Sequence, residues 1–353
     1  MRAALLRPAT LGLLLVVAGC SKEPPSGEPT PAGSAAPSAA PAVASAAPSA
    51  SDVPAPAPSS SGSSAARPAA APSPTATMKL LDPGQAPRRK LRYAWRVEQK
   101  EQLAMDLRTS ASTEVGGAKQ PEIPLPPVHI TIGIDPQSLS PEGDLRYAWR
   151  VTGATVTADT QSPAQVAEGM RTEVAAVEHL TGSALVTSRG LSREVTVDAT
   201  TVLDAGATGQ MVEQVRQTLR DLAAPLPEED VGRGARWQKL TQLDSKDTRL
   251  TQTETFTVMD LQADRGTLDD VLAQTAPPQA LRAPGMPQGA QARMESMLAS
   301  GDAKTRFDLS RLVPQSKFDG TTTMVVSGQA AGDSSHRVTM LMRVGIVIQG
   351  TTR

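Results

Sequence analysis

Hydrophobic and polar residues alternate along much of the chain after Met78, with the period of two that is typical of half-buried β-strands. The clearest runs cover residues 91–97, 128–134 and 338–348. The last run is long for a strand, and together with residues 321–327 it predicts a C-terminal β-hairpin. Further strands are expected at residues 183–203, 235–243, 248–261 and 303–309.

Two segments instead space their apolar residues three and four apart, which predicts helices with one apolar stripe each. The first is expected to have Ser162 as its N-cap and Pro163 as its first helical residue, and to end before Gly182. The second is expected at about residues 209–223, with Pro225 just beyond it. The two stripes consist of Val166, Met170, Val174 and Val177, and of Val212, Val215, Leu219 and Leu222.

Strands outnumber helices, and no βαβ alternation is sustained along the chain. The pattern therefore predicts an α+β fold: a mainly antiparallel, curved sheet with two helices packed on it. Residues 277–290 are rich in proline and are expected to form a long surface loop.

One seven-residue sequence, Leu-Arg-Tyr-Ala-Trp-Arg-Val, occurs twice, at residues 91–97 and 145–151. Both copies are expected to be strands whose Tyr and Trp side chains build part of the core, because aromatic residues bury large areas. The opposite face carries arginines that could instead bind phosphate or carboxylate groups of a lipid or wall polymer. These candidates are Arg92, Arg96, Arg146 and Arg150.

The N-terminus has the order of an export signal, with basic residues first, then an apolar run, then small residues before Cys20. The apolar run is about nine residues, too short to span a bilayer. Residues 15–20, Leu-Val-Val-Ala-Gly-Cys, resemble the lipobox of bacterial lipoproteins. The resemblance implies a signal peptide at residues 1–19, lipidation of Cys20 and anchoring in the cell envelope. Ser21 in place of Asp implies the outer membrane, with the protein facing the periplasm or the cell surface.

Residues 20–77 consist of the lipidated Cys and a segment made almost entirely of Pro, Ala and Ser. Such a composition cannot bury enough apolar area to offset the entropy of ordering, so a disordered tether is expected there. Frequent proline biases it toward an extended spacer. Residues 78–353 are then expected to fold as a single α+β domain.

Charge and composition narrow the possible partners. The 35 basic and 36 acidic residues nearly cancel, and aromatic residues make up only 2% of the chain, so no nucleic-acid partner is expected. A single Cys supports neither an internal disulfide nor a thiolate metal site. No metal and no cofactor are predicted.

Catalytic motifs are not found. The three histidines, His129, His179 and His336, lie apart and form no zinc-protease pattern. The acidic clusters at residues 228–230 and 269–270 lack the spacing of a calcium loop and are expected in solvated turns. A non-catalytic protein is therefore predicted.

Residues 226–237 contain Leu-Pro followed by Val-Gly-x-Gly-x-x-Trp. This segment, with Phe307-Asp308-Leu309 and the later Pro314, resembles a family of uncharacterised proteobacterial lipoproteins. The resemblance covers most of residues 78–353 and implies no catalytic residues. Physically, Gly232 and Gly234 allow a sharp turn, and Trp237 is expected to fill the core at the start of a strand.

The expected role is binding or structural. A curved sheet carrying two helices is similar in outline to the open half-barrels of periplasmic lipid-carrying lipoproteins, which implies a lipid or another hydrophobic ligand. The alternatives are an envelope hydrolase that uses carboxylates and a scaffold for an envelope protein partner; the oligomeric state stays open. Several methionines could line a ligand cavity or simply fill the core, and Met340 and Met342 are the candidate contacts. The full set is Met294, Met297, Met324, Met340 and Met342.

Overall fold

The computed structural model describes residues 75–158, 161–198, 207–244, 249–281, 291–329 and 336–352. The predicted signal peptide, Cys20 and nearly all of the 20–77 tether lie outside these ranges. The described residues form a 15-stranded sheet, a two-stranded sheet and two helices, and the strands of both sheets pair antiparallel. The predicted α+β class with a mainly antiparallel sheet is confirmed.

The large sheet follows the order β1-β11-β12-β13-β15-β16-β17-β3-β6-β7-β8-β9, with β4, β5 and β14 as short additions. Its first strand therefore pairs with a strand from the middle of the chain, and the C-terminal strand β17 pairs with β3. The strands are β1 (Thr75–Asp82), β2 (Arg89–Lys90), β3 (Glu101–Val115), β4 (Ala118–Lys119), β5 (Ile123–Pro124), β6 (Val128–Leu139), β7 (Leu145–Val156), β8 (Thr181–Val186), β9 (Ser192–Val197), β10 (Asp230–Val231), β11 (Arg236–Asp244), β12 (Arg249–Gln262), β13 (Arg265–Ala276), β14 (Gln279–Leu281), β15 (Gln291–Asp308), β16 (Gln315–Gln329) and β17 (His336–Thr352).

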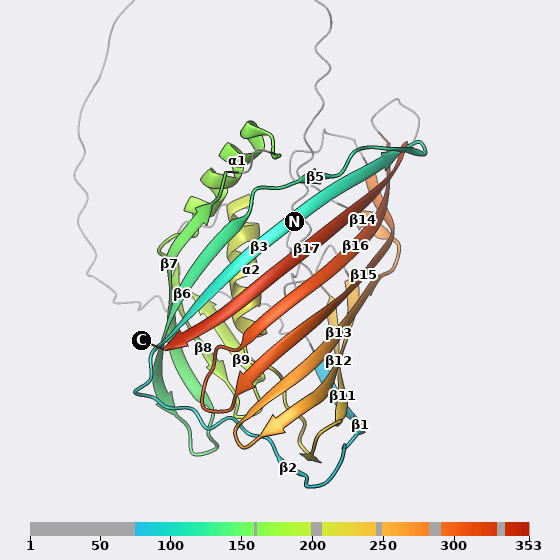
Figure 1. Ribbon diagram of the computed structural model, residues 1–353. Helices are drawn as coiled ribbons and strands as arrows, with labels where there is room; N and C mark the ends of the chain where they lie inside the picture. Colours follow the sequence, from blue (N-terminus) through green and yellow to red (C-terminus); the bar gives the residue numbers. More distant parts are fainter. Residues whose placement is uncertain are drawn as a thin grey trace, which may run out of the picture. The chain divides into compact units, whose positions relative to one another are not determined.

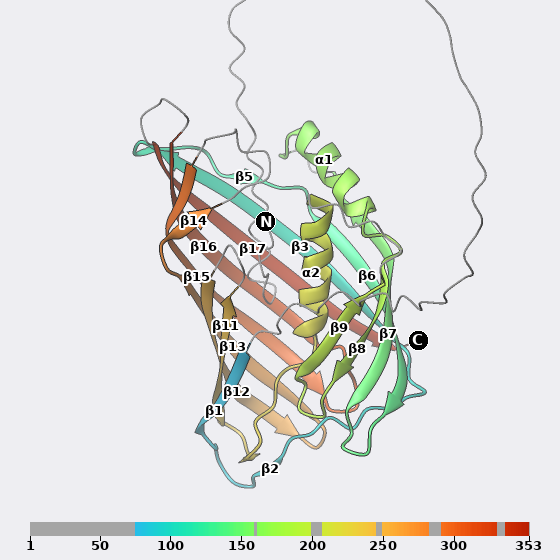
Figure 2. The same cartoon turned by 180° about the vertical axis from the view of Figure 1, so that it is seen from behind.

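The long strands cross the molecule obliquely and the sheet curves, so that it has a convex and a concave side (Figure 1). Helices α1 (Ala164–Ala175) and α2 (Ala207–Arg220) lie toward one end of this sheet, where α1 packs along β7 and α2 along β9. Seen from behind, α2 stands in front of the concave side (Figure 2). Both predicted helices are thus confirmed.

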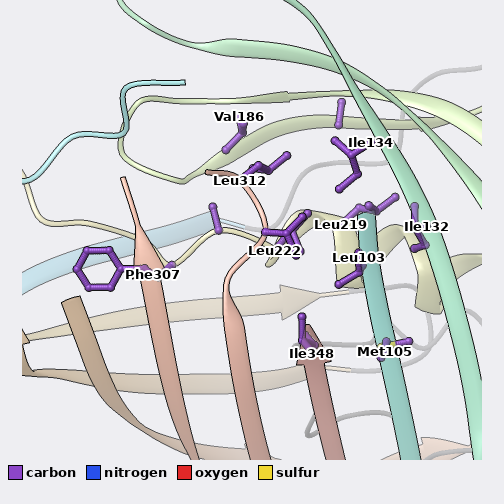
Figure 3. Packing of buried hydrophobic residues seen from close by; sticks show 14 of the residues in the cluster. Leu103, Met105, Ile132, Ile134, Val186, Leu219, Leu222, Phe307, Leu312 and Ile348 are labelled. Atoms are coloured by element: carbon purple, nitrogen blue, oxygen red, sulfur yellow. The ribbon is translucent and has the colours of Figure 1, made fainter. Parts of the chain in front are cut away.

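The main core lies between the helices and the sheet. Leu219 of α2 and Leu222, just after the helix, meet Leu103 of β3, and Ile132 and Ile134 of β6 lie beside them (Figure 3). All of these side chains are at most 4% exposed. The predicted apolar stripe of the second helix therefore faces the core, and burial of this kind stabilises the fold by about 25 cal/mol per Å² of apolar surface.

The start of α1 differs from the prediction. Pro163, not Ser162, is the N-cap, and no side chain caps this helix. The Ser162 hydroxyl donates instead to the carbonyl of Pro124, over 2.8 Å. The helix also ends at Ala175, well before Gly182, because the chain turns through residues 176–179 to enter β8.

The two identical heptads adopt different structures. Residues 145–151 lie within β7, whereas residues 91–96 are extended but belong to no strand, so the strand predicted for the first copy is wrong. Its backbone N–H groups bind separate loops: Tyr93 donates to Ser188 and Ala94 donates to Leu309. The Tyr and Trp side chains are buried in both copies, as predicted.

The C-terminal hairpin is confirmed as β16 and β17, which are longer than predicted; residues 330–335, between these strands, lie outside the described residues. Strand β13 was missed, and residues 269–270 lie within it instead of in a solvated turn. Part of the expected 277–290 loop forms β14, which pairs with β15, and residues 282–290 lie outside the description.

The glycine-rich turn before β11 has the predicted chemistry. Gly234 has a φ of +80°, and a Cβ on Gly232 would clash with the carbonyl of Gln85. Trp237 is fully buried, its indole N–H donates to the Pro225 carbonyl over 3.0 Å, and its ring stacks on Phe256. Trp237 thus connects the segment after α2 to the start of β11.

Candidate functional site

The predicted methionines come together on the concave face of the sheet. Strand register places Met297 of β15 opposite Met324 of β16, and Met324 opposite Met340 of β17. Met294 and Met342 face the same side, two or three residues along their strands. We call these five residues the methionine surface.

The methionine surface is separate from the helix-covered core. Met294, Met297, Met324 and Met342 are 2–7% exposed, and Met340 is partly buried. None of the five belongs to the cluster of buried side chains that packs around α2. The strongest contacts between a helix and a strand are those of α1 with β7 and of α2 with β9. Methionine is flexible and polarisable, which suits a surface that adapts to ligands of varied shape.

A second feature of the concave face is a set of buried charges next to the C-terminal end of α2. Lys239 of β11 lies 2.9 Å from Asp221, just after α2, and 3.3 Å from Glu254 of β12. The three side chains are 11%, 8% and 0% exposed. Asp270 of β13 faces the same side and is also buried. Two carboxylates thus lie against one ammonium group in a region of low water access, and a third carboxyl group is buried on the same face.

Buried amides and hydroxyls adjoin these charges. Gln217 donates to Asp221 over 2.6 Å, and Gln274 donates to Gln252 over 2.6 Å. Three further polar atoms are buried without a hydrogen-bond partner among the described residues: Nε2 of Gln214, Oε1 of Gln217 and the hydroxyl of Thr241. We call this group the polar cluster; it consists of Gln214, Gln217, Asp221, Lys239, Thr241, Gln252, Glu254, Asp270 and Gln274.

The register connects the polar cluster to the methionine surface. Thr241, Gln252 and Gln274 lie opposite one another on β11, β12 and β13. The same row continues through Ala299 and Thr322 to Met342. Because neighbouring strands are about 4.8 Å apart, this row extends about 24 Å along the sheet. The concave face is therefore polar at one end of the row and apolar at the other.

Sequence reasoning missed the polar cluster. Its members come from α2, from the residue just after this helix and from three strands. Those on the strands lie among apolar residues in the alternating pattern. Gln252 and Glu254 stand at the inward positions of β12 together with Phe256 and Val258, and this period is the one signal that could have revealed them.

The candidate arginines are not equivalent. The guanidinium of Arg92 donates to the carbonyls of Pro227 and Glu228, over 2.8 and 3.0 Å, and so holds the loop before β10. Arg96 is exposed outside any strand, while Arg146 and Arg150 are exposed on β7. Whether these residues bind a lipid or wall polymer stays a prediction.

Other titratable residues include the three histidines and the buried Glu101. His129 pairs with Asp106 over 2.8 Å, and both side chains are about half exposed. His179 is exposed, and the side chain of His336 lies outside the description. Glu101 of β3 accepts the backbone N–H groups of Leu312 and Val313, over 2.8 and 3.0 Å. Burial raises the pKa of Glu101, although these bonds favour its charged form.

Within the described ranges, no group of three or more His, Cys, Asp or Glu side chains could hold a metal ion. In the same ranges, neither helix is long and apolar enough to cross a membrane. No protein-family model matches the sequence, and a search of curated proteins likewise finds no match. The resemblances at residues 15–20 and 226–237 therefore stay predictions.

Proposed function

We propose that this protein is a non-catalytic lipoprotein of the bacterial envelope that binds the acyl chain of a lipid on its methionine surface. The N-terminal pattern supports the anchor, since residues 1–19 have the order of a signal peptide and end at Cys20. Two or more acyl chains on Cys20 would hold the protein stably on a membrane. The domain would then act at the outer membrane, displayed by the 20–77 tether.

The single observation that carries ligand binding is the alignment of Met297, Met324 and Met340 on three adjacent strands, outside the helix-covered core. The helix-covered core is filled mainly by aliphatic and aromatic side chains, with Met105 as the one buried methionine among its described residues, whereas these methionines gather outside it. An acyl chain matches this surface chemically, since it is apolar and conformationally variable.

Binding is tested on the full chain carrying Cys20→Ser, recovered from a bacterial periplasm without detergent. Native mass spectrometry should show a copurifying lipid, and the protein should enhance the fluorescence of the apolar probe N-phenyl-1-naphthylamine. Met340→Gln should weaken probe binding, because it places an amide on the methionine surface. Met259→Gln is the matched control, since Met259 is 46% exposed on β12. An apo mass together with no probe binding would overturn the proposal.

The anchor is tested separately by growing cells with labelled palmitate. The wild-type chain should incorporate label and fractionate with the outer membrane. Cys20→Ser should abolish both. Equal labelling of the two chains would refute lipidation at Cys20.

A further inference from the structure

We infer that the polar cluster is a head-group site, and that the ligand is an acyl amphiphile with an uncharged, hydroxyl-bearing head group such as glycerol. This inference rests on the proposed function, because it supplies the polar end of the ligand whose acyl chain lies on the methionine surface. The register brings the two ends together on one face, through the row from Thr241 to Met342.

The first argument is the set of unpaired polar atoms. Gln214, Gln217 and Thr241 are 5%, 4% and 6% exposed, and each has a buried polar atom without a partner among the described residues. Leaving such atoms unpaired is costly, so a binding site is a natural explanation for their retention. They comprise one donor, one acceptor and one hydroxyl that can do both. An alcohol group on the ligand can also both donate and accept.

The second argument concerns the side of the Asp221–Lys239 pair on which these atoms lie. Trp237 at the start of β11 bonds to Pro225 just after α2, so the end of the helix lies at the start of the strand. Asp221 and Lys239 pair at this level. Moving back along α2 reaches Gln217 and Gln214, and moving forward along β11 reaches Thr241. The unpaired atoms of both elements therefore lie on the same side of the Asp221–Lys239 pair.

The third argument is charge. Asp221 and Glu254 lie against the ammonium of Lys239, and the carboxyl group of Asp270 is buried on the same face. A phosphate or carboxylate head group would meet like charges in a buried site, which is strongly unfavourable. The cluster consequently selects against anionic lipids.

The acyl end of the ligand has a direct path from this site. Gln274 lies opposite Ala299, and Met297 is two residues further along the same strand. Diagonal neighbours at this spacing are within reach of long side chains. An amphiphile whose hydroxyls bind the polar cluster can thus extend its chain over Met297 and Met324.

The test uses three ligands with the same 18-carbon chain, namely monooleoylglycerol, methyl oleate and oleate, in displacement of N-phenyl-1-naphthylamine from the full chain carrying Cys20→Ser. Monooleoylglycerol should displace the probe at about tenfold lower concentration than methyl oleate, as one or two buried hydrogen bonds would give. Oleate should be weaker still. Equal displacement by the three would overturn the head-group site while leaving the acyl-binding function standing. Stronger displacement by oleate would also overturn it, and displacement by none would overturn the proposed function itself.

Thr241→Val identifies the site because the two residues have the same shape. The variant should lose about fivefold to tenfold in affinity for monooleoylglycerol and keep its affinity for methyl oleate. Its urea midpoint without ligand should rise, since an unpaired buried hydroxyl is removed; a purely structural threonine would not combine these effects. Thr253→Val, on the outer face of β12, is the matched control. Gln214→Leu should repeat the result from α2, and unchanged preference in both variants would refute the site.

Discussion

Replacing Lys239 by Met removes the ammonium group that lies against two buried carboxylates and should strongly destabilise the fold. Lys239 lies 2.9 Å from Asp221 and 3.3 Å from Glu254, whose side chains are 8% and 0% exposed. Met keeps most of the aliphatic length of Lys but removes the positive charge that lies against both carboxylates. Breaking a buried ion pair on one side costs about 3–5 kcal/mol, and we expect the free energy of unfolding to fall by that amount.

The assay is urea unfolding of the full chain carrying Cys20→Ser, followed by tryptophan fluorescence and by circular dichroism. Lys317→Met is the control, because Lys317 pairs with Asp319 over 3.1 Å while both side chains are more than two-thirds exposed. This exposed pair should contribute about 0–1 kcal/mol. If Lys239→Met costs no more than Lys317→Met, the contact between α2 and β11 is not buried in the native protein and the polar cluster does not exist as described.

Three other predictions test the packing and the pH dependence. Gly301→Ala should lower the free energy of unfolding by about 1–3 kcal/mol, because the added Cβ would clash with the ring of Phe318. Gly153→Ala is the control: its Cβ would meet open space, so the change should be neutral or slightly stabilising. Equal costs of the two substitutions in chemical unfolding would contradict this packing. Trp237→Phe should cost about 2–3 kcal/mol, since it removes the bond to Pro225 and leaves a void; a thermal midpoint equal to that of the wild type would refute this. Burial raises the pKa of Glu101, so the folded protein binds this proton more tightly than the unfolded chain, and the resulting stability is lost as pH rises above the usual value of 4.5. As pH rises above 4.5, the free energy of unfolding of the wild type should therefore fall relative to that of Glu101→Gln. If the two free energies instead change with pH in parallel, the Glu101 carboxyl keeps its ordinary pKa.

Much of the fold followed from the sequence because alternation reports directly which side chains are buried. The hairpin of β16 and β17, the stripe of α2 and the buried position of Trp237 all depend on local spacing or local turn residues. The methionines were also recognisable as candidates. Which of them lie opposite one another could not be predicted, because it depends on the register of β15, β16 and β17.

The charged residues show the limit of local patterns. Asp270 looked like part of a solvated acidic turn, yet it lies inward on β13. Strand β13 was missed because acidic and small residues obscure its alternation. An inward carboxylate is stable only when other elements supply a suitable environment, and nothing near it in the sequence reveals this.

The duplicated heptad separates the two kinds of information most clearly. By itself, the sequence determined that four aromatic side chains would be buried: Tyr93, Trp95, Tyr147 and Trp149. They lie on the apolar face of their segments, and removing apolar surface from water is favourable whichever part of the protein packs against that face. Only the tertiary structure decided that one copy is a strand and the other a connection between loops. Backbone hydrogen bonds go to whichever partners the fold brings alongside, and these come from residues far away in the chain.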